Sequence, residues 1–155
     1  MRPNGGHTRL LVPVIGTVVL SFVSALFNQS RAILYLPLLI SLNFGASFAY
    51  SLLRPPSIVE IFATTYSSVL SAEAVRYCRL VTGIWVGFFA FNATIAGLTA
   101  CCSSLETWSL YNGLISYCLL GLLFVGELCY RYWRFRRYVG APTDAFFKRI
   151  FPPKE

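Results

Sequence analysis

The sequence predicts an all-α fold, an integral membrane bundle of four transmembrane helices with a cytoplasmic interfacial helical loop. Three observations predict this class. Hydrophobic residues make up 56% of the 155 residues and charged residues only 12%, about half of the roughly 25% that is typical of soluble domains. Four apolar runs are long enough to cross a bilayer. Almost all lysines and arginines lie between or beyond these runs, on one side of the expected bundle.

We expect the four spans at residues 10–27, 32–53, 80–102 and 107–130, which together make a membrane domain of residues 10–130. The remaining parts are an N-terminal tail (1–9), an interfacial loop (54–79) and a basic amphipathic tail (131–155). The apolar runs are continuous rather than alternating, so they do not fit the strands of a β-barrel.

The first span, Leu10 to Phe27, tolerates Pro13 because proline is accepted in the first turn of a helix. A cleavable signal is the alternative, since Arg2 and Arg9 precede an apolar stretch. No small-x-small cleavage site closes the stretch and another span follows it. An uncleaved span is therefore favoured.

The distribution of cations predicts the orientation. Every lysine and arginine except Arg31 lies in the N-terminal tail, in the loop 54–79 or in the C-terminal tail, and these regions share one side of a four-span protein. The positive-inside rule places that side, with both termini, in the cytoplasm. Trp108 then marks the outer interface and Trp133 the inner one, and the outer loops 28–31 and 103–106 are short.

The interfacial loop begins where the second span ends. Pro55 and Pro56 stop that span, because proline lacks an N–H and disfavours helix in the preceding residue. The motif Ser57–Glu60 fits a capping box that starts a new helix. Ile58, Ile61 and Phe62 fall on one side of this helix, so we expect it to lie in the headgroup plane.

A second helix start follows in the same loop. Ser71 and Glu73 place a capping hydroxyl and an acid at the positive end of a helix dipole. This helix carries Arg76 and Arg79 into the third span.

The C-terminal tail alternates cations with aromatic residues in RYWRFRRY, from Arg131 to Tyr138. Such interleaving binds single-stranded nucleic acid in some proteins, but directly after a span it more often binds anionic lipid headgroups. We expect the lipid bilayer and no nucleic acid as the partner. Residues 144–151, DAFFKRIF, add a small amphipathic patch on the same surface.

Polar side chains inside the spans are the candidate intramembrane sites. Asn43 and Asn92 lie near the middle of their spans, and an unpaired amide in hydrocarbon is costly, so a hydrogen bond between them is expected. The alternatives are a structural bond between helices and a polar patch that touches a lipid headgroup or lines a conduit. Asn112, near the start of the fourth span, is placed to line a shallow outer cleft.

Glu127 is the acidic residue inside an apolar segment. An ionisable group in a span is a functional hypothesis by default, and a headgroup or proton site is one interpretation. Arg131, four residues later, favours a structural ion pair instead.

Catalytic and metal-binding patterns are sparse. The five cysteines show no zinc-like spacing, and we interpret them as small buried or lipid-facing residues. The single histidine, His7, lies in the N-terminal tail, and Glu60 and Glu127 are the remaining candidates for a general base. We expect no metal site, no cofactor and no enzyme, with a membrane lipid-modifying enzyme as the weaker alternative.

Three stretches carry a family resemblance: SLLRPPSIVEIFA, EAVRYCRLVTGIWVGFFAFNATIA and LETWSLYNGLISYCLLGLLFVGEL. They resemble an uncharacterised family of small bacterial inner-membrane proteins, often encoded beside fatty-acid-synthase-like genes for aryl polyene pigments. The matching residues, within roughly Leu36 to Arg131, are Arg54-Pro55-Pro56, Glu60, Trp85, Phe88-Phe89, Asn92, Trp108, Tyr111-Asn112-Gly113 and Glu127. A weaker similarity, in Trp85, Phe89, Asn92 and the loop 54–79, links the chain to the intracellular septation protein A family.

Two departures from the first family stand out. Its members are typically longer at the N-terminus, with a further hydrophobic segment, and the basic tail here is longer. No activity is established for the family, so the resemblance implies a biosynthetic context and the bacterial cytoplasmic (inner) membrane, and not a reaction.

We therefore expect a non-enzymatic accessory or scaffold protein that supports membrane-associated lipid or aryl-polyene-type biosynthesis. Its partners would be anionic headgroups and lipid-biosynthesis enzymes or an acyl carrier protein, with self-association left open. The candidate contacts are Arg54, Glu60, Arg76, Arg79, Arg131 and Arg134. The alternatives are a small, oligomeric lipid or polyene carrier that uses Asn92, Asn112 and Glu127 as a polar path, and a protein that organises the envelope or division.

Overall fold

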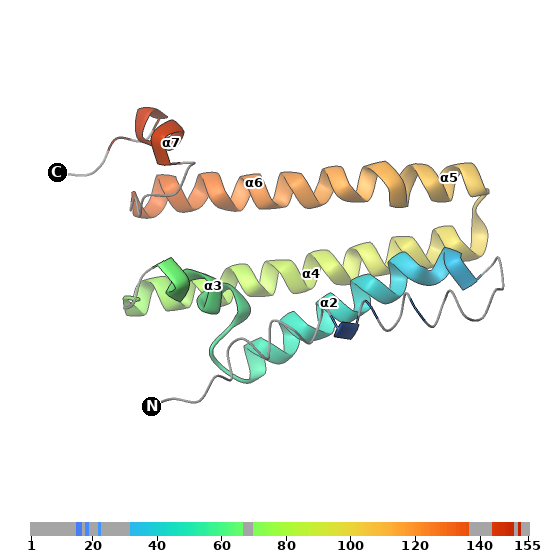
Figure 1. The fold of residues 1–155 in the computed structure, drawn as a ribbon, viewed down its shortest axis with the longest axis horizontal. Helices are drawn as coiled ribbons and strands as arrows, with labels where there is room; N and C mark the ends of the chain where they lie inside the picture. The colour runs from blue at the N-terminus through green and yellow to red at the C-terminus, as the bar shows by residue number, and fades with distance from the viewer. Residues whose placement is uncertain are drawn as a thin grey trace. The chain divides into compact units, whose positions relative to one another are not determined.

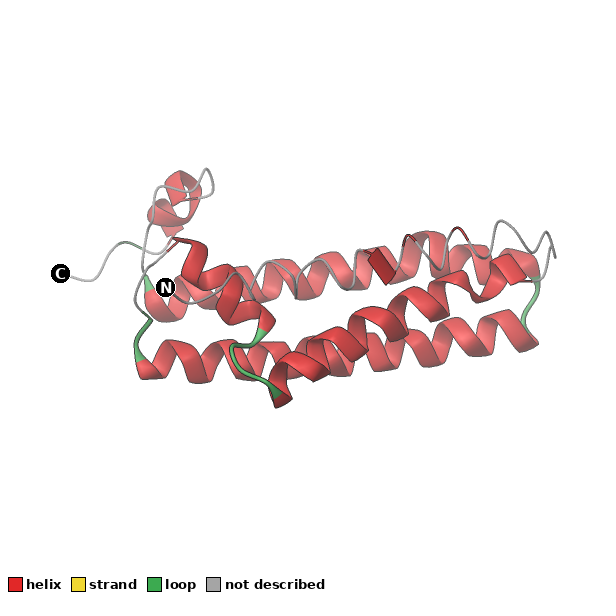
Figure 2. Ribbon diagram, turned by 60° about the horizontal axis from the view of Figure 1, so that its bottom comes forward, coloured by secondary structure: helices red, strands yellow, loops and turns green. Residues whose placement is uncertain are grey.

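The structure, a computed structural model, describes residues 15, 16, 18, 22, 32–66, 70–136, 144–150 and 152. Figure 2 shows helices joined by loops, with no strand in the described ranges. The elements are η1 (Ala32–Tyr35), α2 (Leu36–Leu53), α3 (Ile58–Tyr66), α4 (Ala72–Cys102), α5 (Leu105–Leu110), η2 (Tyr111–Ile115), α6 (Ser116–Phe135) and α7 (Asp144–Ile150) (Figure 1).

The chain divides into two compact units, Met1–Ile115 and Ser116–Glu155. The first unit contains η1 to η2, and the second contains α6 and α7.

Three helical stretches are long and apolar enough to cross a membrane: Ile33–Leu53, Ala72–Cys102 and Leu105–Phe135. The all-α class is confirmed, and these stretches include almost all of the expected spans 32–53, 80–102 and 107–130. The first expected span, 10–27, lies outside the described residues except at four positions, and the tail 1–9 lies wholly outside them.

The second expected span ends where the sequence predicts. The N–H of Arg54 donates to the carbonyl oxygen of Tyr50 at 3.0 Å, and Arg54 then leaves the helical conformation with φ −127° and ψ 85°. Pro55 and Pro56 follow, joined by a cis peptide bond. The double proline therefore ends α2 at Leu53, because neither proline can donate the next helical hydrogen bond.

The predicted capping box at the start of α3 is only half formed. The Ser57 N–H donates to the Glu60 carboxylate at 3.3 Å, but the Ser57 hydroxyl is buried and has no hydrogen-bond partner. Ser51 of α2 replaces it, since its hydroxyl oxygen accepts from the Ile58 N–H at 3.2 Å. The N-terminus of α3 is thereby fastened to the last turn of α2.

The packing of α3 separates two of the residues that were expected to share its apolar side. Ile58 is buried, since α3 packs against α2 and α4. Phe62, one turn later, is 54% exposed. The helix therefore turns Ile58 toward its helical neighbours and keeps Phe62 at the surface.

The helix start at Ser71 is confirmed. Its hydroxyl oxygen accepts from the Ala74 N–H at 3.3 Å, and Glu73 lies in the first turn. The helix α4 then runs for 31 residues to Cys102, about 46 Å at 1.5 Å per residue. It exceeds the roughly 30 Å hydrocarbon core, so it includes both the turns with Arg76 and Arg79 and the expected span 80–102.

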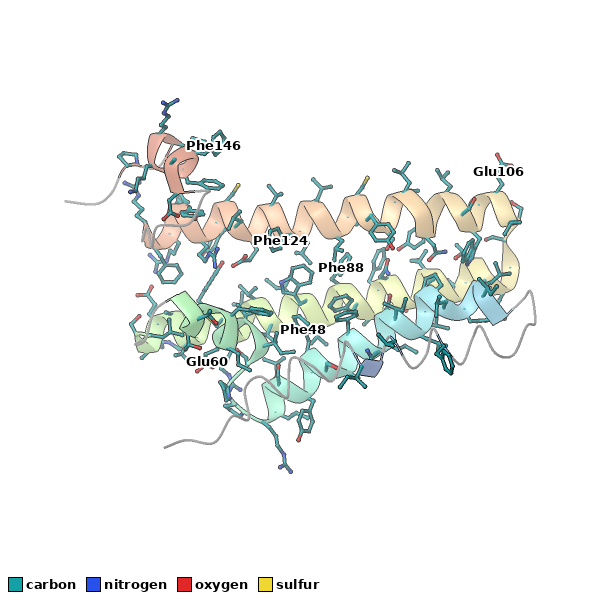
Figure 3. The ribbon with its side chains drawn as sticks, viewed as in Figure 1. Phe48, Glu60, Phe88, Glu106, Phe124 and Phe146 are labelled. Atoms are coloured by element: carbon teal, nitrogen blue, oxygen red, sulfur yellow. The ribbon has the colours of Figure 1, made fainter. Side chains whose placement is uncertain are left out.

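Aromatic packing joins α2 to α4, which lie side by side in Figure 1. Phe89 is at its centre, with ring centroids 5.5 Å from Phe44, 5.4 Å from Phe48 and 5.9 Å from Trp85. Gly45 allows this approach, because a Cβ added there would lie 3.3 Å from the Phe89 Cβ. Phe48 and Phe88, labelled in Figure 3, belong to the two facing helices.

The last span begins earlier and ends later than predicted. The Ser104 hydroxyl accepts from the Thr107 N–H at 3.2 Å, so the helix starts at Leu105 and the connection shrinks from the expected 103–106 to two residues. The indole N–H of Trp108 donates to the Leu34 carbonyl at 2.9 Å and ties this start to η1. At the other end the helix continues past Tyr130 to Phe135.

The expected tail 131–155 is therefore helical over its first residues, and α7 folds back onto this end of α6. The Tyr132 hydroxyl donates to Asp144 at 2.6 Å, and the Tyr132 ring stacks on Phe147 with centroids 4.2 Å apart. All three side chains are buried, so this contact stabilises α7 against the end of α6.

Candidate functional site

Two hydrogen bonds, one buried and one partly buried, link α2, α4 and η2 within the first unit. The amide nitrogen of Asn92 donates to the Ser41 hydroxyl at 2.9 Å. The Tyr111 hydroxyl donates to the amide oxygen of Asn92 at 3.1 Å. Asn92 thus connects three separate elements, and Ser41 and Asn92 are both buried. We call Ser41, Asn92 and Tyr111 the Asn92 network.

The network differs from the expected pair of Asn43 and Asn92. Ser41 and Asn43 are two residues apart on α2, about 200° around a helix of 3.6 residues per turn. Ser41 faces α4, whereas Asn43 lies beside Gly16, where an added Cβ would come within 2.6 Å of its amide oxygen. Asn43 therefore belongs to a different surface of α2.

Asn112 extends the polar region toward the end of α4. Its amide nitrogen donates to the Thr99 hydroxyl at 3.2 Å and to the Trp108 carbonyl at 3.0 Å. Thr99 in turn donates to the Ala96 carbonyl at 3.1 Å. The side chain is only 8% exposed, and its amide oxygen is buried without a hydrogen-bond partner. The expected shallow cleft at Asn112 is therefore replaced by a buried contact.

A π-helical turn, η2, brings Tyr111 and Asn112 to the same neighbour. Hydrogen bonds in a π-turn run from i to i+5 and widen the helix, and such turns are frequent at functional sites. Tyr111 and Asn112 are adjacent in sequence, yet both reach α4 side chains. The widened turn is the local feature that lets consecutive residues serve one interface.

The depth of the Asn92 network follows from α4. Asn92 precedes the helix end at Cys102 by ten residues, about 15 Å at 1.5 Å per residue. This is about half of a 30 Å hydrocarbon core. Hydrogen bonds between membrane helices contribute about 0.6 to 2 kcal/mol each, so the network helps to hold α2, α4 and η2 together ten residues before the end of α4.

The groups in this region are neutral hydroxyls and amides. They orient and hold other polar groups by donating and accepting hydrogen bonds, and they add no net charge. Among the described residues, no cluster of three His, Cys, Asp or Glu side chains has the arrangement to hold a metal ion. The five cysteines are free thiols, of which Cys78 is buried.

Arg54, Glu60, Arg76 and Arg79 lie in the region formed by the end of α2, the helix α3 and the first turns of α4, which we call the α2–α3–α4 corner. These candidate contacts are of two kinds. The Arg79 guanidinium donates to the Leu52 carbonyl at 3.1 Å, so it caps one of the carbonyls that the end of α2 leaves open. Glu60, labelled on α3 in Figure 3, accepts from the Ser57 N–H. Arg54, over the Tyr50 ring at 6.0 Å, and Arg76 are exposed. Arg79 and Glu60 therefore stabilise the corner through hydrogen bonds, whereas Arg54 and Arg76 are exposed cations on its surface.

The candidate contact residues of the second unit lie in the C-terminal turns of α6. Arg131 is exposed and lies over the Tyr132 ring at 5.9 Å, and Arg134 is exposed. Glu127 is half-buried. Glu127 lies four residues before Arg131 on α6, and the ion pair expected between them stays a prediction.

Sequence reasoning did not identify several residues that complete these sites: Ser41, Thr99, Tyr111 as a donor, Tyr132 and Asp144. The signal for Ser41 was its spacing of four from Gly45, typical of close helix packing. The position of Tyr111 next to Asn112 indicated that it could matter, but the residue to which its hydroxyl donates depends on the π-helical turn η2.

Comparison with known proteins adds no relative. No protein-family model matches the chain, and no curated protein or solved structure matches it either. The resemblance to the aryl-polyene-associated family therefore stays an expectation from the sequence.

Proposed function

We propose that the protein is a non-enzymatic accessory or scaffold protein of the bacterial cytoplasmic membrane. The observation that carries the proposal is the α2–α3–α4 corner. Three local bonds brace it, from Ser57 to Glu60, from Ile58 to Ser51 and from Arg79 to Leu52. Arg54 and Arg76 are exposed on this braced surface.

A fixed surface with exposed cations suits an acidic partner. Complementary charge steers association and fixes the orientation of two surfaces. The positive-inside rule, applied to Arg54, Arg76 and Arg79, assigns the corner to the cytoplasmic side. We expect an acyl carrier protein or a lipid- or polyene-building enzyme there, because the sequence resembles a family with that genetic context.

The test is photocrosslinking in cells from a benzoylphenylalanine placed at Phe62, which is exposed on α3. Leu122, also exposed but within the apolar span on α6, is the control position. Capture of a carrier protein or synthase at 62 and not at 122 supports the proposal. Arg54→Gln with Arg76→Gln should reduce this capture, and capture that ignores both charges, or recovers no such protein, contradicts it.

A lipid or polyene carrier is the second candidate, and the buried amide oxygen of Asn112 favours it. That oxygen lacks a donor within the described residues, so a carrier role requires η2 to open and expose it to a hydroxyl or amide of the cargo. Extraction of lipids from each leaflet after Asn92→Leu or Glu127→Gln tests the idea. An unchanged distribution across the leaflets would count against a carrier.

A further inference from the structure

The helix α7 is fastened to the end of α6 at three points. The Tyr132 hydroxyl donates to Asp144 at 2.6 Å, and the Tyr132 ring stacks on Phe147. Arg136 ends α6 in the left-handed conformation, with φ 45°, and its guanidinium donates to the Pro152 carbonyl at 3.2 Å. These contacts hold both ends of α7, so its outward surface has a fixed direction relative to α6.

The outward surface of α7 is amphipathic. Phe146 and Ile150 are 64% and 51% exposed and are four residues apart, which places them on one side of a helix. Phe146 is labelled on α7 in Figure 3. Arg149, also exposed, is adjacent to Ile150 and borders the apolar pair. Lys148 is exposed as well. Two large apolar side chains with flanking cations are typical of helices that lie in a bilayer interface.

The position of α7 along the chain places this surface at the membrane boundary. Its anchor, Tyr132, lies in the last turns of the apolar stretch Leu105–Phe135. Tyr130 and Trp133 flank the anchor, are exposed and pack with ring centroids 5.7 Å apart. Tyrosine and tryptophan concentrate where spans leave the hydrocarbon. The outward surface of α7 is therefore presented at the level where a span enters the headgroup region.

We propose that α7 docks on the anionic surface of the same bilayer that α6 crosses. Phe146 and Ile150 enter the boundary between headgroups and acyl chains, and Arg149 binds lipid phosphate in the same plane. An anionic bilayer offers both an apolar layer and phosphate charge at this level, which is the combination that α7 displays. The Tyr132–Asp144 bond sets the angle at which α7 meets the surface.

The experiment uses the full-length protein in phospholipid vesicles and a benzoylphenylalanine placed at Phe146. Ala145, exposed on α7 and about 100° away around the helix, is the matched control position. Vesicles of phosphatidylcholine alone are compared with vesicles that contain about 30 mol% phosphatidylglycerol, since surface cations respond to anionic lipid. Mass spectrometry separates adducts with lipid from adducts with protein.

We expect lipid adducts at 146 in several-fold excess over 145, and a higher yield in the anionic vesicles. Arg149→Gln should reduce the gain from anionic lipid by up to about fivefold, which corresponds to one cation near the surface. Tyr132→Phe removes the hydroxyl donor and keeps the ring, so it should bring the yields at 146 and 145 closer together.

Three results would overturn the proposal. These are equal yields of lipid adduct at 146 and 145, a yield at 146 that is the same with and without phosphatidylglycerol, and adducts at 146 with a second protein chain. Both probe positions are exposed, so we expect benzoylphenylalanine at either position to leave the fold intact. Thermal unfolding of each variant, compared with the parent protein, checks this.

Discussion

Removal of the Tyr111 hydroxyl tests whether the Asn92 network holds the spans together. In Tyr111→Phe the ring stays, and Asn92 loses the donor that lies 3.1 Å from its amide oxygen. Hydrogen bonds between membrane helices average about 0.6 kcal/mol and reach about 1.7. Because this bond joins η2 to a buried amide, we expect the free energy of unfolding to fall by about 1 kcal/mol.

A double-mutant cycle isolates this bond. Tyr111→Phe and Asn92→Leu each remove it, and the double variant can lose it only once, so the two costs should not add. We expect a coupling energy of about 0.6 to 1.7 kcal/mol. The assay is unfolding of the purified protein by SDS in mixed micelles, followed by far-UV circular dichroism.

Tyr117→Phe is the matched control. Tyr117 is 67% exposed, and its hydroxyl has no hydrogen bond within the part of the chain that the structure describes. The substitution should change the free energy of unfolding by less than about 0.5 kcal/mol. A coupling energy near zero, or an equal cost for Tyr117→Phe, would refute the assignment of a stabilising bond between Tyr111 and Asn92.

Three further substitutions probe the helix packing with the same unfolding assay. Arg79→Gln removes the donor to the Leu52 carbonyl and should lower the free energy of unfolding by about 1 kcal/mol. The control, Arg76→Gln, changes an exposed residue of the same helix and should leave the free energy of unfolding almost unchanged. Equal losses for the two variants would contradict the capping role of Arg79. Gly45→Val places a side chain against Phe89 and should cost about 1–3 kcal/mol, while Gly87→Ala, with open space around it, should be neutral or stabilising. Ser57→Ala removes a buried hydroxyl without a partner, so stability should hold or rise, and a loss typical of a helix cap, about 1 kcal/mol, would show that the hydroxyl is bonded.

The sequence predicts the ends of elements that local chemistry controls. Pro55 and Pro56 stop α2 whatever surrounds them, because they cannot continue a helix. The Ser71 hydroxyl caps α4 by accepting a hydrogen bond from the N–H of Ala74, the third residue of that helix. The apolar runs likewise define three spans by their length alone. Each of these signals acts within a few residues of the feature that it predicts.

The partners of the polar residues were not predictable in the same way. Whether Ser41 or Asn43 faces α4 depends on the rotation of α2, which the packing of Gly45 against Phe89 fixes. Tyr111 and Asn112 face α4 together only because η2 is widened. The contact of Tyr132 with Asp144 and Phe147 joins side chains of two separate helices, α6 and α7, which the periodicity of the sequence does not reveal.

The chemistry of the buried and exposed groups argues for function at the helix ends. Inside the packed helices, the Asn92 amide donates to Ser41 and accepts from Tyr111, and all three side chains are neutral. A charge at that depth would cost about 2.5 kcal/mol or more. The exposed cations lie instead where helices end, as Arg54 does after α2 and Arg149 does on α7. Because these guanidinium groups are exposed, the proposed headgroup or acidic partner would bind them without disturbing the packed interior.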